Sequence, residues 1–204
     1  RKLIDSLKTF DKVNAIVMDL RSNGGGSLVE AISLTGLFID KGPVVQVKDL
    51  RGKIEVDEDE NTGVAWDGPF GVIVDRLSAS ASEIFAGAIQ DYGRGIVMGT
   101  QTYGKGTVQS SIDLNKLVNP GMLQRVAGLI TKNKTTGTAP SSTNPADINL
   151  GQINLTMAKF YRVAGSSTQH KGVTPDVVFP SIYPMDKIGE DTEASALPWD
   201  VIPS

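Results

Sequence analysis

The sequence predicts an α/β domain in which β-α units build a largely parallel sheet, with additional β-strands beside it. Two observations support this prediction. An apolar strand, a loop rich in Gly or Ser and an apolar helix follow one another twice, near residues 13–38 and again near 71–92. After the second unit, longer segments alternate apolar and polar residues as strands do. Strands that alternate with helices favour a parallel sheet with helices packed on it.

The first unit follows a short helical segment. Its expected elements are the end of a helix at residues 1–10, a buried strand at 13–18, a glycine loop at 22–26 and a helix that runs to Phe38. Ser27 and Glu30 have the spacing of a capping box, which predicts that this helix begins just after the glycine loop.

A hairpin and a second unit are expected next. Their elements are strands at 44–47 and 53–56, an acidic polar loop at 57–68, a strand at 71–75, a helix from 78 to about 92 and a strand at 96–98. Gly42-Pro43 ends the preceding helix, and Gly93 suits the C-terminal end of the second.

The rest of the chain predicts more strands. They are expected at 107–114, 124–131 and 153–163. Residues 132–149 are rich in Thr, Ser, Asn and Pro and are expected to form a mobile insertion. Residues 182–204 contain prolines and few periodic apolar residues, so we expect a C-terminal surface extension.

Composition excludes several classes of site. The chain has 204 residues, 40% of them hydrophobic, which is enough for one domain with its own core. It has no Cys and a single His, so thiolate chemistry and His-pair zinc sites are excluded. Neither a metal nor a cofactor is expected. With a net charge of −3 and scattered basic residues, we expect no nucleic-acid partner.

The ends of the chain give no targeting signal. No apolar run approaches the ~20 residues that cross a bilayer, and no signal-peptide pattern is present. Because the sequence begins with Arg1, we expect it to be a piece of a longer protein.

The glycine loop is the first candidate for chemistry. Gly24 to Gly26 precede a helix, and successive backbone N–H groups there could stabilise a negatively charged oxygen. Taken alone, the pattern favours a tight turn over an anion-binding site.

Ser80 is the second candidate. It lies where an expected strand turns into a helix, and α/β sheets present nucleophiles at such turns. The rival interpretation is structural, because Ser80 and Glu83 also have the spacing of a capping box.

Lys105 lies between two glycines, in a segment that nearly matches a phosphate-binding loop. The match fails because Gly106 stands where Ser or Thr is required, and because the next residues alternate like a strand. We therefore reject nucleotide binding. An exposed turn lysine is the structural alternative for Lys105.

Composition favours Ser80 and Lys105 together. A Ser/Lys dyad is the hydrolytic scheme that needs only the residue types present. His170 is the competing base, but it lies in a polar stretch next to Lys171 that predicts a solvated turn.

Five segments together resemble one family. They are residues 19–26, 75–84, 90–94, 103–109 and 171–176. In this order and with these gaps, they resemble the C-terminal processing peptidases, also called tail-specific proteases, of serine peptidase family S41.

The resemblance implies roles for individual residues. It makes Ser80 the nucleophile, Lys105 the general base and Gln109 the group that orients the base. It gives Asp91 a supporting role, and we expect Asp91 to pair with a group other than the lysine, with Arg94 as the candidate. It places the oxyanion donors at Gly25 or Gly26 and at the N–H of Ala81.

The resemblance also implies an architecture and a setting. It implies a ClpP/crotonase-like fold, with a peptidase core at 1–181, while the family's PDZ domain is absent from this sequence. It implies an endopeptidase that acts on proteins through unstructured, apolar C-terminal tails. Expected partners are such substrates, the PDZ domain of the parent chain and an adaptor protein. A periplasmic location follows from the family, with peripheral association with the inner membrane through the parent protein.

Two other functions stay open. A catalytically silent module on the same fold could bind extended peptides, for example by strand addition. A crotonase-like acyl-CoA enzyme would also use backbone oxyanion donors, but it gives Ser80 and Lys105 no shared role.

Overall fold

The structure is a computed structural model that describes all residues except 118, 120, 123–124, 126–148 and 204. The chain divides into two compact units. The main unit comprises residues 1–108 and 157–204, and the second unit comprises residues 109–156. Each is described by itself.

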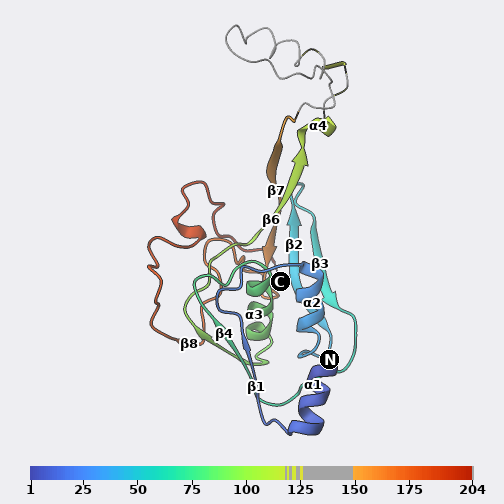
Figure 1. Ribbon diagram of the computed structural model, residues 1–204, viewed down its shortest axis with the longest axis vertical. Coiled ribbons are helices and arrows are strands. Elements are labelled where there is room, and N and C mark those ends of the chain that lie inside the picture. The colour runs from blue at the N-terminus through green and yellow to red at the C-terminus, as the bar shows by residue number, and fades with distance from the viewer. Residues whose placement is uncertain (118, 120, 123–124, 126–148, 204) are drawn as a thin grey trace, which may run out of the picture. The chain divides into compact units, whose positions relative to one another are not determined.

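The main unit contains a four-stranded parallel sheet (Figure 1). Its strands, in spatial order, are β1 (Ile16–Asp19), β4 (Phe70–Val74), β5 (Ile96–Gly99) and β8 (Val177–Val178). All three neighbouring pairs are parallel. The predicted parallel sheet is therefore confirmed, together with three of its strands.

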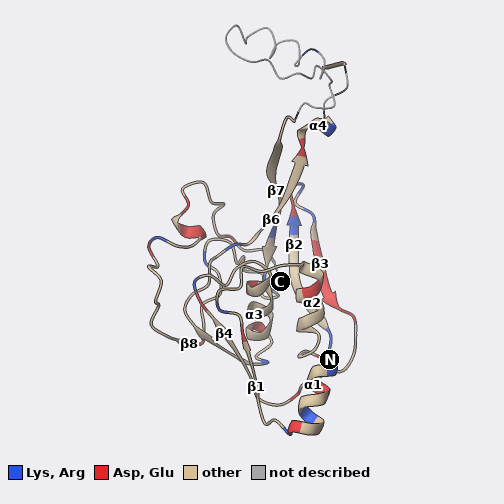
Figure 2. Ribbon diagram, viewed as in Figure 1, with Lys and Arg blue, Asp and Glu red and all other residues tan. Residues whose placement is uncertain are grey.

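The second sheet has the order β3-β2-β7-β6. Its strands are β2 (Gly42–Asp49), β3 (Ile54–Asp59), β6 (Thr107–Asp113) and β7 (Gln152–Tyr161). The pairs β2–β3 and β2–β7 are antiparallel. The predicted hairpin is confirmed and is longer than expected, because β3 continues into the acidic segment, which Figure 2 shows along this strand.

Helices connect these strands. They are α1 (Lys2–Ser6), α2 (Leu28–Thr35), α3 (Ala81–Asp91) and α4 (Leu114–Leu117), and a π-helical turn at Leu7–Asp11 continues α1. The Ser27 hydroxyl accepts the N–H of Glu30 at 3.4 Å, as the capping box predicted. Helix α2 ends at Thr35, three residues before the predicted end. Gly93, at φ +58°, follows the end of α3.

Helix α3 lies between the two sheets (Figure 1). Every residue from Ala81 to Ile89 is buried. Its two faces contribute to different clusters: Phe85, Ala86 and Ile89 pack with Val72, Val74 and Val97 of the parallel sheet, and Ala81, Ile84 and Ala88 pack with Val44, Val45 and Phe160. A helix that is buried on all sides has little freedom to shift, so its first residue is held firmly.

The second unit contains α4 and the outer parts of β6 and β7. The Ser111 hydroxyl donates to Gln152 Oε1 at 2.9 Å, and the Leu114 N–H donates to Gly151 O at 3.1 Å. The strand predicted at 124–131 and the insertion predicted at 132–149 lie almost entirely outside the described residues.

Among its described residues, the tail from residue 182 has a 3₁₀ turn at Glu190–Thr192 and an isolated antiparallel bridge between Val201 and Ser166. Most of its residues are exposed. It is nevertheless attached to the main unit, because Ile202 is buried and its N–H donates to Gly165 O at 2.8 Å. The tail also contacts a buried arginine, described below.

Candidate active site

The glycine loop is attached to the start of α3. The carbonyl oxygen of Asn23 accepts the N–H of Ala79 and the hydroxyl of Ser82, both at 3.0 Å. The Asn23 side chain also accepts the N–H of Gly25 at 3.0 Å. One asparagine therefore fixes the loop against the turn that carries Ser80.

Gly25 is required by this close approach. It has φ +99°, and a Cβ there would lie 2.7 Å from Ala79 O and 2.9 Å from both Ala81 N and Ser80 Cβ. Within the described residues, the N–H groups of Gly26 and Ala81 donate to no protein acceptor, whereas Asn23 engages that of Gly25. Two unengaged donors thus lie in the glycine loop and at the first residue of α3.

Ser80 is the N-cap residue of α3 and has φ +57° and ψ −116°. Positive φ is uncommon for a residue other than Gly and costs conformational energy. Ser80 and Glu83 are arranged as a capping box, in which the Ser80 N–H donates to Glu83 Oε2 at 2.8 Å.

Glu83 connects this turn to the loop around Lys105. Its side chain is fully buried and accepts the N–H groups of Ser80, Gly104 and Lys105 at 2.8, 2.7 and 2.9 Å. Ser80 and Lys105 donate to the same oxygen, Oε2, so their backbone nitrogens can be no farther apart than the total of those two distances, 5.7 Å.

Burial raises the pKa of Glu83 to about 7, while hydrogen bonds from Thr102, Gly104, Ser80 and Lys105 oppose the rise. Desolvation disfavours the carboxylate, and donors aimed at it favour it. The site therefore contains an acidic group that titrates near neutral pH.

The two glycines around Lys105 allow its loop to lie against another backbone segment. Gly104 has φ +92°, and a Cβ there would lie 3.0 Å from the carbonyl carbon of His170. A Cβ on Gly106 would lie 2.3 Å from the N of Gln169. Lys105 itself is half-buried. Strand β6 follows the loop, whereas a phosphate-binding loop is followed by a helix, so the structure agrees with the rejection of nucleotide binding.

Asp91, Gln109 and His170 were also singled out from the sequence. Asp91 is the last residue of α3, about 16 Å along the helix axis from Ser80. Gln109 is exposed on β6 and belongs to the second unit. His170 is half-buried at φ +70°, and the three residues before it are buried, so the expected solvated turn is wrong for this stretch.

The expected partner of Asp91 is also wrong. Asp91 pairs with Arg162, whose Nε lies 3.1 Å from its Oδ2. Arg94 instead donates to the carbonyl oxygens of Phe38, Trp66 and Gly68. The Asp91 carboxylate is therefore held by an arginine on another element, following β7.

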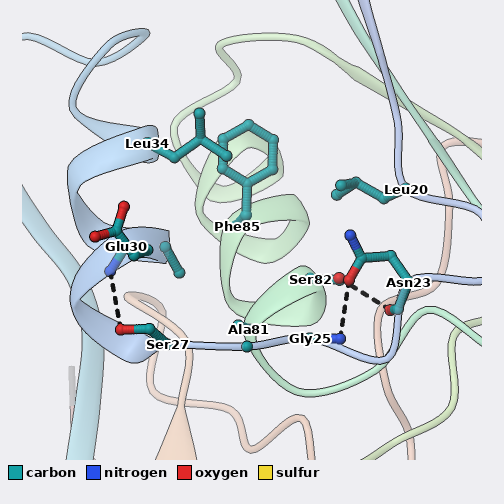
Figure 3. Close-up of a pocket in the computed structure, with 11 residues that line it drawn as sticks. Leu20, Asn23, Gly25, Ser27, Glu30, Leu34, Ala81, Ser82 and Phe85 are labelled. Carbon is teal, nitrogen blue, oxygen red and sulfur yellow. Dashed lines mark hydrogen bonds between the residues drawn. The ribbon is translucent and has the colours of Figure 1, made fainter.

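A cavity of about 230 Å³ opens beside the glycine loop (Figure 3). Its apolar lining comes from Leu20, Ala31, Leu34 and Phe85. Gly25, Gly26 and Ala81 also line it. An apolar side chain that entered this cavity would lie next to the unengaged N–H groups of Gly26 and Ala81.

Sequence reasoning missed two functions of residues in this site. It treated Glu83 only as a capping partner, and it gave Asn23 no role. The capping pattern could have found the contact of Glu83 with Ser80, but the bonds of Glu83 to Thr102, Gly104 and Lys105 join residues 19 to 22 positions apart. Among the described residues, no group of three or more His, Asp or Glu side chains is placed to hold a metal ion.

Comparison with known proteins places this arrangement in a family. The profile of peptidase family S41 matches residues 1–179, which is most of the chain. The chain belongs to peptidase family S41.

Individual S41 relatives agree with this assignment. The chain is 45% identical over its full length to a tail-specific protease of Haemophilus influenzae, and 34% identical over 92% of its length to the chloroplastic carboxyl-terminal-processing peptidase 2 of Arabidopsis thaliana. It spans only 26% and 30% of those two proteins.

A solved S41-like structure has the same fold. The photosystem II D1 C-terminal processing protease matches 87% of this chain with a TM-score of 0.64 and 26% identity, and the match covers 37% of that protein. The α/β core is accordingly of the predicted ClpP/crotonase-like type. In the described part of the chain, no helix has both the length and the hydropathy needed to cross a bilayer.

Proposed function

We propose that this S41 chain is the catalytic core of a serine endopeptidase that uses a Ser80/Lys105 dyad. The observation that carries the proposal is the shared acceptor Glu83 Oε2, which holds the backbones of both residues within 5.7 Å of each other. The same buried carboxylate joins a serine turn at positive φ to a lysine that lies between two glycines.

The proposed reaction has two stages. The uncharged amine of Lys105 takes the proton of the Ser80 hydroxyl while Oγ bonds to the scissile carbonyl carbon. The resulting oxyanion is bound by the N–H groups of Gly26 and Ala81, each contributing about 3 kcal/mol to the transition state. The lysine then gives its proton to the leaving amine, and water, deprotonated by the same lysine, hydrolyses the acyl-enzyme.

Two residues have supporting roles in this proposal. Gln109 orients the lysine amine, a role that rests on the family resemblance alone. Asp91 acts structurally, because its ion pair with Arg162 joins the end of α3 to the segment after β7. The buried ion pair also keeps this carboxylate away from the lysine, where a negative charge would favour the protonated amine.

The apolar cavity supports the substrate class. An apolar residue of an extended chain would bury its side chain among Leu34, Phe85 and Leu20 while its carbonyl faced the oxyanion donors. This agrees with the C-terminal processing named in several relatives. We propose that the substrates are unstructured protein tails with apolar C-terminal residues.

The setting is proposed from the family. Capture of substrate tails would fall to a PDZ domain of the parent chain, with an adaptor protein as a further partner. We place the protein in the periplasm, associated peripherally with the inner membrane through its parent chain.

Labelling with a serine-directed fluorophosphonate tests the dyad. We expect the chain to label at Ser80, and Ser80→Ala not to label. Lys105→Arg should lower the labelling rate about 10²- to 10⁴-fold, because a guanidinium stays charged and cannot act as a base. The control is Lys41→Arg, an exposed lysine that should leave the rate unchanged.

Two outcomes would contradict the proposal. Wild-type labelling in Lys105→Arg would exclude the lysine as the base. Binding of an apolar tail peptide by a wild-type chain that does not label would favour the peptide-binding module instead.

A further inference from the structure

Every backbone N–H group of the loop that carries Lys105 donates a hydrogen bond. We call residues 102–106 the lysine loop. Its five N–H groups donate, in chain order, to Val173 O, Ser78 O, Glu83 Oε1, Glu83 Oε2 and Gln169 Oε1, at 3.2, 3.0, 2.7, 2.9 and 2.8 Å. Four of its carbonyl oxygens accept hydrogen bonds. A loop bonded in this way is preorganised by its surroundings.

The C-terminal tail makes one of those carbonyl bonds directly and reaches one of the N–H groups through Gln169. We call residues 185–191 the strap. The N–H of Glu190 donates to the carbonyl oxygen of Tyr103 at 2.9 Å. The carboxylate of Glu190 accepts Gln169 Nε2 at 2.9 Å, and Gln169 Oε1 in turn accepts the N–H of Gly106. The strap is therefore hydrogen-bonded to Tyr103, which precedes Lys105 in the sequence, and is linked through Gln169 to Gly106, which follows it.

Arg76 provides the second connection. Its side chain is 1% exposed, and its guanidinium donates to Thr102 O of the lysine loop at 2.9 Å. All its other acceptors are in the strap: Met185 O, Ile188 O and the carboxylate of Asp191. A buried guanidinium needs these partners, so the strap and the lysine loop are held by one charged group.

The strap is fitted closely to this arginine. Gly189 has φ +133°, and a Cβ there would lie 2.2 Å from an Arg76 nitrogen. The strap also lies beyond the S41 match, which ends at residue 179. It nevertheless lies within the stretch that aligns with the Haemophilus influenzae protease, and it contacts the loop of the proposed base.

We propose that the strap is a positioning element for Lys105. Through Glu190 and Arg76 it fixes the backbone of the lysine loop in the arrangement that directs the amine to Ser80. Glu83 holds the same loop from the side of α3, so Lys105 is fixed between the nucleophile helix and the C-terminal tail. This inference rests on the proposed function, because it takes Lys105 as the base.

The test uses Glu190, which reaches the loop through Gln169. The rate constant for labelling of Ser80 is measured as a function of pH, with a melting curve for every variant. Glu190→Ala should lower the rate about tenfold to a hundredfold, the effect of a small misplacement of a catalytic group, and should change the pH profile. Glu190→Gln keeps an oxygen acceptor for Gln169 and should restore both.

The matched control is Glu193→Ala, an exposed carboxylate in the same tail. It should label as wild type does. A purely structural strap would lower the melting temperature of Glu190→Ala and leave its pH profile unchanged. If Glu190→Ala does not fold, Glu190→Asp, shorter by one methylene, takes its place under the same criteria.

The two proposals fail in different ways. A wild-type rate and pH profile in Glu190→Ala, with labelling lost in Lys105→Arg, would overturn the strap and leave the dyad intact. Normal labelling in Lys105→Arg would overturn both.

Discussion

Glu83 combines two opposed influences at one carboxylate. No solvent reaches it, which disfavours its charge, yet four donors converge on its two oxygens. The balance raises its pKa from the ordinary 4.5 to about 7. The charged form fits the four donors, because a carboxylate only accepts, whereas the acid would turn one proton toward them.

The titration of Glu83 predicts a pH dependence of stability. Between pH 4.5 and 7 the folded state binds more protons at this group than the unfolded state, so the free energy of unfolding falls as pH rises through that window. The fall amounts to about 3 kcal/mol. Glu83→Gln should remove this slope and also slow labelling of Ser80, because the amide would direct N–H groups at other donors.

Urea unfolding at several pH values measures the slope. Glu60→Gln, at an exposed position, is the control and should keep the slope of the wild type. An identical slope in Glu83→Gln and the wild type would contradict the assignment.

At this scale the sequence alone could identify residue types but not their distant partners. Ser80, Lys105 and Gly25 lie at turns that local patterns and the family resemblance both mark. The partner of Asp91 could not be predicted, because Arg162 is 71 positions away and the nearer Arg94 competes on spacing alone. The position of Gln109 relative to the dyad remains a prediction.

At the scale of elements, the glycine loop is hydrogen-bonded to the N-terminal end of α3. Helix α3 is buried against both sheets, and Asn23 ties the loop to its start. Rigid elements hold catalytic groups more accurately than free loops do. The oxyanion donors of the proposed site therefore depend on how closely the loop can approach the helix.

Two neighbouring glycines test this dependence. Gly25→Ala would place a Cβ 2.7 Å from a backbone oxygen at φ +99°, whereas a Cβ at Gly24 would meet nothing within 4 Å. Gly25→Ala should lower the free energy of unfolding by about 1–3 kcal/mol and strongly slow labelling. Gly24→Ala, the matched control, should change neither much. Equal behaviour of the two variants would show that close approach of the loop is unimportant.

Elements with strong local signals were predicted best. The capping residue Ser27, the stop at Gly93 and the apolar runs of β4 and β5 all have signatures of a few residues. Strand β8 has only two residues, Val177 and Val178, which pair with β5. A strand this short has no local sequence pattern that predicts it. The early end of α2 likewise depends on turns that its apolar sequence does not reveal.

At the scale of the molecule, the strap connects the C-terminal tail to the first half of the chain. Sequence reasoning expected only a surface extension there, since prolines and sparse apolar residues give no sign of a buried partner. Arg76, the residue that binds the strap, follows β4 by two positions and looks like an ordinary loop arginine in the sequence. Its burial is visible only in three dimensions.

Asp191 offers a test of this connection. Asp191→Ala leaves the guanidinium of Arg76 buried without its carboxylate, which should lower the free energy of unfolding by about 3 kcal/mol. Asp186→Ala, an exposed carboxylate in the strap, should change it by less than about 0.5 kcal/mol. Chemical denaturation measures both. Equal losses would mean that the ion pair does not hold the strap.

The backbone at residue 80 restricts which amino acid can occupy that position. With φ at +57°, a second branch on the Cβ of residue 80 would crowd its own main chain, and the loop opposite is close, because a Cβ added at Gly25 would lie 2.9 Å from Ser80 Cβ. Threonine carries the same hydroxyl but has the extra methyl group. The backbone conformation at residue 80 and the nearby loop therefore favour serine over threonine, independently of how reactive the two hydroxyl groups are.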